Sequence, residues 1–166
     1  MKQSIGEEFA HTLAIYCSDG RFASACEQFI QQALGEQRFD RFVVPGGAGW
    51  MCLGVLTVWE HELARRHISF LVEAHGIQRV ILIAHQSCGF YERYHLPPEQ
   101  TERRQIEDLW TAIRTLRERH PNLVIEAYYL RVRERQPLFE AITLQTPPYE
   151  SLSPPQAGGF LQPPRE

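Results

Sequence analysis

The segment from residue 79 to residue 85, RVILIAH, is the part of the sequence that most restricts the fold. Its middle is wholly apolar and rich in β-branched residues. Such a segment is typical of a strand at the centre of a parallel sheet, where helices cover both faces. Similar apolar segments at residues 12–18, 39–44 and 123–130 are predicted to be further strands.

Stretches with helical spacing of apolar residues separate these predicted strands. The predicted helices cover residues 24–34, 57–75 and 100–119, and Ser24 is expected to cap the first of them. Strands and helices therefore alternate along the chain. This order predicts an α/β fold with a mainly parallel central β-sheet flanked by helices.

The length of 166 residues predicts one domain, at residues 1–145. Residues 146–166 are rich in proline and poor in apolar residues, and they are predicted to form a tail without a core of its own. The net charge of −3 gives no reason to expect nucleic acid as a partner. We recognise no secretory signal, and the apolar segments are too short to span a membrane, so we expect a cytoplasmic protein.

Reactive side chains are concentrated in two short segments, CSDGR at residues 17–21 and HQSCG at residues 85–89. Each follows a predicted strand, and the carboxyl ends of parallel strands meet at one edge of a sheet. Cys17, His85 and Cys88 would there offer two thiolates and one imidazole, a ligand set that suits a zinc ion (Zn²⁺). Three protein ligands leave the fourth position to water or substrate, as in catalytic zinc sites.

A purely structural role is the alternative for each of these residues. Cysteine is among the most buried residue types, and a single cysteine at the end of a strand is more often a core residue than a ligand. We assign Cys26 and Cys52 to the core for this reason. Asp19 and Arg21, taken alone, would form a surface ion pair that contributes little to stability.

The two segments together resemble the paired zinc motifs of β-class carbonic anhydrases, Cys-x-Asp-x-Arg and His-x-x-Cys-Gly. The resemblance extends over roughly residues 12–92 and includes the helix and strand that lead to His85. It implies that Cys17, His85 and Cys88 bind zinc. It also implies that Asp19 and Arg21 form a catalytic dyad, in which Asp19 either pairs with Arg21 or moves onto the metal.

The resemblance further implies reversible hydration of carbon dioxide to bicarbonate and assembly into a homodimer or a dimer-based oligomer. Trp50, Phe70 and the proline-rich tail are then expected to contact a neighbouring subunit. The substrate pocket is expected to include Phe42, Gly47, Phe70 and Gly89.

Several positions depart from the family pattern and support other functions. Gly20 stands where serine is usual, Glu8 where glutamine is usual and Phe70 where tyrosine is usual. Residues 45–49, PGGAG, replace a run that normally contains arginine and asparagine. One alternative is hydrolysis of another small heterocumulene, such as carbonyl sulfide or carbon disulfide. A second is a zinc-binding relative with weak catalysis, which Glu8 and the changed loop favour.

Overall fold

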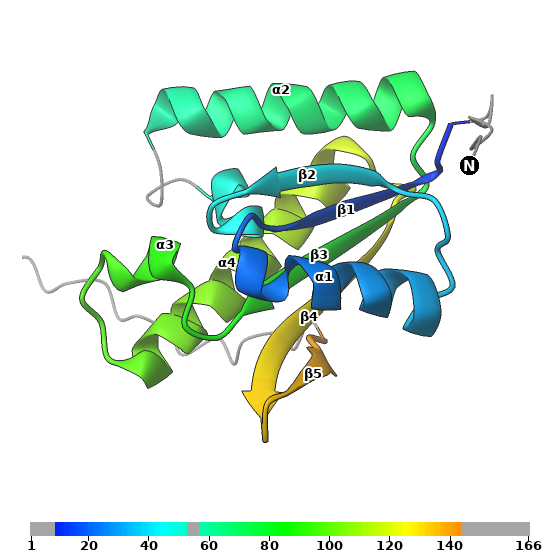
Figure 1. Ribbon diagram of the computed structural model, residues 1–166. Coiled ribbons are helices and arrows are strands. Elements are labelled where there is room, and N and C mark those ends of the chain that lie inside the picture. Colours follow the sequence, from blue (N-terminus) through cyan, green and yellow to red (C-terminus); the bar gives the residue numbers. More distant parts are fainter. Residues whose placement is uncertain (1–8, 53–56, 144–166) are drawn as a thin grey trace, which may run out of the picture.

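A five-stranded sheet forms the centre of the protein in the computed structural model, which describes residues 9–52 and 57–143 (Figure 1). The strand order is β2-β1-β3-β4-β5, and all neighbours are parallel except β4 and β5. The strands are β1 (Thr12–Cys17), β2 (Asp40–Val44), β3 (Arg79–His85), β4 (Val124–Arg133) and β5 (Gln136–Ala141). The predicted α/β fold with a mainly parallel sheet is thereby confirmed.

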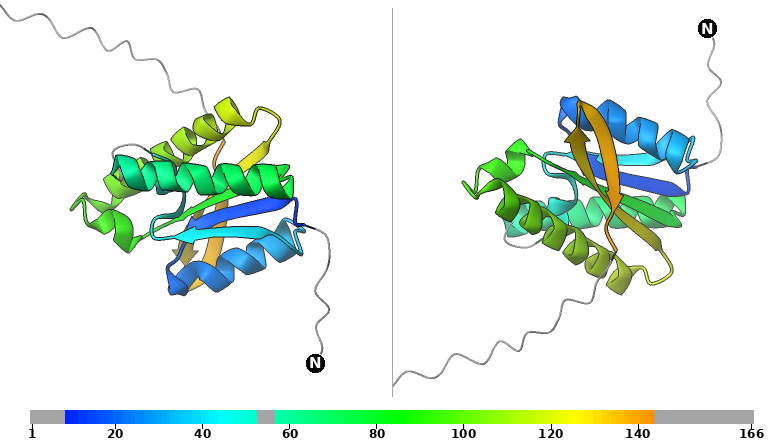
Figure 2. Two further views of the ribbon diagram at one scale, coloured as in Figure 1. Left: turned by 90° about the horizontal axis from the view of Figure 1, so that it is seen from above. Right: turned by 90° about the horizontal axis from the view of Figure 1, so that it is seen from below.

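Helices cover both faces of this sheet, with α2 and α4 on one face and α1 on the other (Figure 2). The α-helices are α1 (Gly20–Gln28), α2 (Val58–His75), α3 (Gly89–Glu92) and α4 (Pro98–Arg119). A π-helical turn η1 (Phe29–Ala33) extends α1, and a 3₁₀ turn η2 (Gly47–Met51) follows β2. Among the described residues, no helix has the length and apolar character needed to cross a membrane.

The alternation of side chains along β1 explains why it is apolar throughout. Leu13 and Ile15 belong to the core that α2 and α4 cover, whereas Ala14 and Tyr16 belong to the core under α1. Successive residues of a strand point to opposite faces, so a strand covered on both sides needs apolar residues at every position.

The first helix begins earlier than the sequence pattern predicts, and Ser24 is not its cap. Asp19 is the N-cap, because its carboxylate accepts the backbone N–H of Arg21 at 3.0 Å. The helix α1 therefore begins at Gly20, shortly after the end of β1. The prediction for α2 was accurate: Thr57 caps the helix together with Glu60, and Gly76 ends it in a left-handed conformation.

The strand β5 is absent from the sequence-based prediction. It pairs with β4 through a tight turn at Glu134 and Arg135, whose φ angles of 49° and 65° are both positive. Two positive φ angles in a two-residue turn are typical of a type I′ hairpin, which normally uses asparagine or glycine. Because neither is present, the sequence gives no hairpin signal. Glu8 and the predicted tail at residues 146–166 lie outside the described residues.

Candidate metal centre

Two adjacent strands bring the predicted metal ligands together. Cys17 is the last residue of β1 and His85 is the last residue of β3, and these strands pair in parallel. Cys88 follows in the short loop before α3. All three side chains are buried, and their ligand atoms lie within 4.8 Å of one another. The site lies at the carboxyl edge of the sheet, beside the first turn of α1 (Figure 1).

The separation of the two sulfur atoms fits a shared metal ion. The Sγ atoms of Cys17 and Cys88 are 3.7 Å apart. A disulfide would require about 2.05 Å. Two sulfurs bound at about 2.3 Å to a tetrahedral zinc ion are separated by roughly 3.8 Å. The pair therefore has the spacing of two ligands to one ion.

His85 presents a free nitrogen to the two sulfurs. Its Nδ1 lies 2.9 Å from the carbonyl oxygen of Gln86, which can only accept, so Nδ1 carries the proton. Nε2 is buried and has no hydrogen-bond partner among the residues that the structure describes. The ring of Phe22 covers the imidazole at a centroid distance of 4.3 Å. This fixed tautomer leaves the lone pair of Nε2 available to a metal, as in metal sites whose histidine is held by its other nitrogen.

The sulfur pair favours one thiolate even without a metal. The hydrogen bond from the thiol of Cys88 is the main cause that lowers the pKa of Cys17 to about 4, and the backbone N–H of Gly46, 3.2 Å from the Cys17 sulfur, acts in the same direction. The same hydrogen bond between the two sulfur atoms, together with burial, raises the pKa of Cys88. By contrast, burial raises the pKa of Cys26 to about 12. Metal ligation requires thiolates, and the site favours one at Cys17 before any metal binds, whereas Cys26 lies outside the group of ligand atoms.

The loop at residues 45–49 contributes its backbone to the site. Gly46 and Gly47 have positive φ angles of 82° and 53°. A Cβ atom on Gly47 would lie 2.9 Å from the carbonyl carbon of Tyr16. The glycines therefore let the loop pass close to the end of β1 and direct an N–H to Cys17. The sequence analysis identified the unusual loop but did not predict the N–H of Gly46 as a donor to Cys17. The Pro-Gly-Gly segment directly after a strand is the sequence signal that could have indicated it.

Asp19 and Arg21, which follow Cys17 in the first motif, form a bidentate ion pair. Arg21 Nε lies 3.0 and 3.1 Å from the two carboxylate oxygens of Asp19, and Arg21 Nη2 lies 2.6 Å from Oδ2. Arg21 Nη2 also donates to the carbonyl oxygen of Ser87 at 2.9 Å. These hydrogen bonds from Arg21 are the main cause that lowers the pKa of Asp19 to about 2. The pair thus links both sequence motifs and directs the carboxylate of Asp19 to Arg21.

The structure does not gather all the residues expected in the substrate pocket. Gly47 and Gly89 lie next to the ligands, since Gly47 packs on the end of β1 and Gly89 follows Cys88. Phe42 lines a hollow of about 300 Å³ between β2 and α2. Phe70 lies near the carboxyl end of α2, is 62% exposed, and contacts His75 at a ring distance of 6.3 Å. Within one chain it is therefore far from the metal ligands, and its pocket role stays a prediction.

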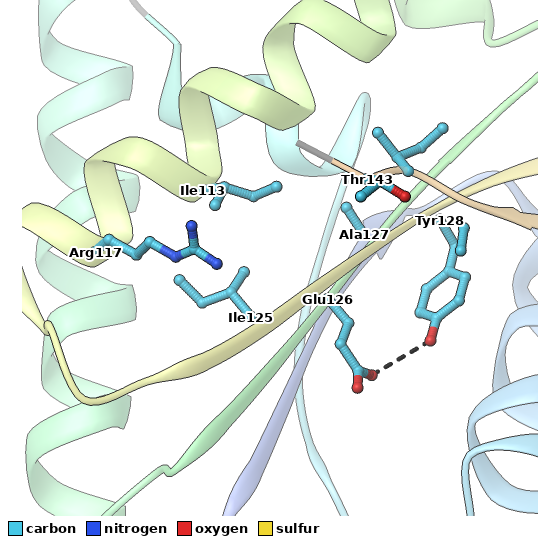
Figure 3. Close-up of a pocket in the computed structure, with 9 residues that line it drawn as sticks. Ile113, Arg117, Ile125, Glu126, Ala127, Tyr128 and Thr143 are labelled. Carbon is cyan, nitrogen blue, oxygen red and sulfur yellow. Dashed lines mark hydrogen bonds between the residues drawn. The ribbon is translucent and has the colours of Figure 1, made fainter. Parts of the chain in front are cut away.

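A separate hollow of about 370 Å³ lies between α4 and the hairpin of β4 and β5 (Figure 3). Ile113 and Arg117 line it from α4, and Ile125 lines it from β4. Glu126 and Tyr128 are hydrogen-bonded to each other at 3.3 Å. Of the described residues that line it, none is a cysteine or a histidine. The hollow therefore offers none of the soft ligands found at the end of β1 and β3.

Solved structures that match this architecture include β-carbonic anhydrases. A carbonic anhydrase from Streptococcus mutans matches with a TM-score of 0.56 and 13% identity, covering 86% of this chain and 88% of that chain. One of two tetrameric β-carbonic anhydrases from Sordaria macrospora matches with a TM-score of 0.51 and 14% identity, covering 81% and 82%. At such identities the likeness defines the fold, which is that of the β-carbonic anhydrases.

The sequence comparison gives the family. The family model described as putative carbonic anhydrase matches residues 7–137. The chain belongs to this family, which confirms the resemblance noticed in its motifs. A relative from Rickettsia bellii, described as an uncharacterized protein, is 27% identical over 127 residues, which cover 73% of this chain and 76% of the relative.

Proposed function

We propose that this chain binds one zinc ion through Cys17, His85 and Cys88 and catalyses the reversible hydration of carbon dioxide to bicarbonate. The observation that carries the proposal is the unpartnered, buried Nε2 of His85 facing two sulfurs that are 3.7 Å apart. An unsatisfied buried nitrogen costs free energy, and a metal ion would remove that cost. Membership of the carbonic anhydrase family supports the choice of reaction.

A zinc ion held by these residues would act as a Lewis acid and make hydroxide available from water near neutral pH. The protein supplies the remaining parts. Cys17 and Cys88 provide negative charge, and the N–H of Gly46 offsets part of it at the Cys17 sulfur. Arg21 keeps the carboxylate of Asp19 ionised and fixed, so a free lone pair of Asp19 can accept a hydrogen bond from the reacting water.

The direct test is the rate of carbon dioxide hydration by zinc-loaded protein, followed with a pH indicator. We expect saturable acceleration that disappears when zinc is removed with a chelator and returns when zinc is added back. Bovine serum albumin at equal concentration controls for buffering by protein. Zinc-loaded protein that gives no acceleration from neutral to mildly alkaline pH would instead favour the weakly catalytic, zinc-binding alternative.

The loop at residues 45–49 is a specific reason to test a second substrate class. It offers small side chains and backbone groups, with no basic side chain to hold a bicarbonate anion. Carbonyl sulfide and carbon disulfide are uncharged linear heterocumulenes like carbon dioxide. Release of hydrogen sulfide from carbonyl sulfide, measured beside the hydration assay, distinguishes the two. Faster turnover of carbonyl sulfide would assign the chain to this alternative.

We also propose a homodimer in which α2 contacts a second copy. Trp59, Leu63 and Phe70 lie on one side of α2 and are 85%, 51% and 62% exposed. Large apolar side chains in one stripe are typical of an interaction surface. The tetrameric assembly of the Sordaria macrospora structures supports association in this fold.

Replacing Leu63 by glutamate should shift the assembly toward monomer at micromolar concentration, because a charge in an apolar interface is costly to bury. Val124→Glu introduces the same charge at an exposed apolar residue at the start of β4 and should leave the assembly unchanged. Light scattering coupled to size-exclusion chromatography measures the mass. A wild-type protein that is strictly monomeric would contradict the proposed dimer.

A further inference from the structure

A buried hydrogen-bonded group lies behind the candidate metal centre, on the side of α4. Tyr91 of α3 is only 2% exposed, and its hydroxyl donates to Asp108 Oδ2 at 2.8 Å. Asp108 of α4 is 5% exposed, and its Oδ1 lies 3.2 Å from Nε of Arg104. Cys52 adds a hydrogen bond from Sγ to the backbone oxygen of Asp108 at 3.2 Å. Helices α3 and α4 therefore meet at one buried carboxylate, and Cys52 contacts the backbone of the same residue.

The same tyrosine contacts the metal centre. Cys88 is the N-cap of α3, and the backbone N–H of Tyr91 donates to the carbonyl oxygen of Cys88 at 2.9 Å. The side chain of Tyr91 packs in one cluster with Cys17 and Cys88. Tyr91 thus holds the backbone of Cys88 through its own N–H, while its hydroxyl holds α3 against α4.

We infer that Tyr91, Asp108 and Arg104 are positioning residues, which hold the first turn of α3 so that the Cys88 sulfur stays in place for metal binding. This inference rests on the proposed zinc site. A buried carboxylate is stable only with partners, so Asp108 requires both Tyr91 and Arg104. The short helix α3 has few hydrogen bonds of its own, so its orientation depends on such an anchor. Outer partners that orient a ligand commonly change metal affinity 10- to 100-fold when removed, as a rough guide.

The variant Tyr91→Phe tests this role, because it removes one hydroxyl and keeps the ring in the core. We expect its zinc affinity, measured by competition with a chromogenic chelator, to fall by roughly 10- to 100-fold. Asp108→Asn should have a similar effect. The double variant should bind zinc about as weakly as the weaker single variant, because both changes break the same link.

Two further measurements separate positioning from general stabilisation. The absorption of the cobalt-substituted protein reports the cobalt–thiolate bonds directly, and we expect its bands to shift in Tyr91→Phe. The matched control is Tyr128→Phe, which removes a phenol–carboxylate hydrogen bond of 3.3 Å to Glu126. It should leave zinc affinity and the cobalt spectrum unchanged. The free energy of unfolding of the metal-free proteins shows how much each variant affects folding alone.

The outcomes are distinct for the two proposals. If wild-type protein binds zinc tightly and Tyr91→Phe binds it as tightly as Tyr128→Phe with an unshifted cobalt spectrum, the positioning role is wrong and the proposed function stands. That conclusion holds even if Tyr91→Phe unfolds more easily, since the network would then only stabilise packing. If wild-type protein binds no zinc, both the proposed function and the positioning role fail.

Discussion

Replacing Cys88 by serine should remove most of the zinc from the purified protein while leaving the fold in place. Cys88 provides one of the two sulfurs, 3.7 Å from that of Cys17, and is almost completely buried. A serine hydroxyl stays protonated near neutral pH and is a poor ligand for zinc compared with a thiolate. Two ligands, Cys17 and His85, would remain, which is fewer than zinc sites in proteins normally use.

Metal analysis of freshly purified protein measures this effect. Wild-type protein should contain about one zinc ion per chain, as expected for a single site. The control Cys26→Ser makes the same change at a buried cysteine of α1 that lies outside the ligand group, and it should keep its zinc. Wild-type protein without zinc, or Cys88→Ser with full occupancy, would contradict the assigned ligands.

Replacing Arg21 by alanine should strongly reduce carbon dioxide hydration while zinc stays bound. Arg21 holds the carboxylate of Asp19 with two nitrogens and also binds the carbonyl oxygen of Ser87, between His85 and Cys88. Without it, Asp19 is free to turn toward the metal and compete with water. Loss of a partner of this kind typically costs about 10- to 100-fold in activity, and we expect a reduction in that range.

The measurement pairs zinc content with hydration rate for each variant. Arg21→Lys keeps the positive charge but loses the bidentate contact with Asp19, so its hydration rate should lie between those of wild type and Arg21→Ala. Arg41→Ala is the matched control, because Arg41 likewise binds a carboxylate and a backbone carbonyl, those of Glu27 and Phe39, at 2.8 and 3.1 Å. Its rate should equal that of wild type. Full activity in Arg21→Ala would exclude the dyad from the mechanism.

The predicted features that the structure reproduces rest on local patterns in the chain. The apolar strand at residues 79–85 and the helical spacing at residues 57–75 correspond to β3 and α2. The positions of Cys17 and His85 at strand ends predict their meeting, because adjacent parallel strands end at the same edge. Where local signals were weak, the prediction failed: Asp19, rather than Ser24, caps α1, and the hairpin at Glu134 lacks a typical turn residue.

The environment of the metal ligands was decided by the tertiary structure alone. The donor from Gly46 to Cys17, the bond from Arg21 to Ser87 and the link from Tyr91 to Asp108 each join residues that belong to different elements. Periodicity indicates only which face of its own element a residue occupies, and a capping signal indicates only where a helix begins or ends. Which groups then approach within hydrogen-bond distance depends on how those elements pack. The sequence by itself therefore determined the type of sheet and the residues at its carboxyl edge, whereas packing decided which neighbours hold them.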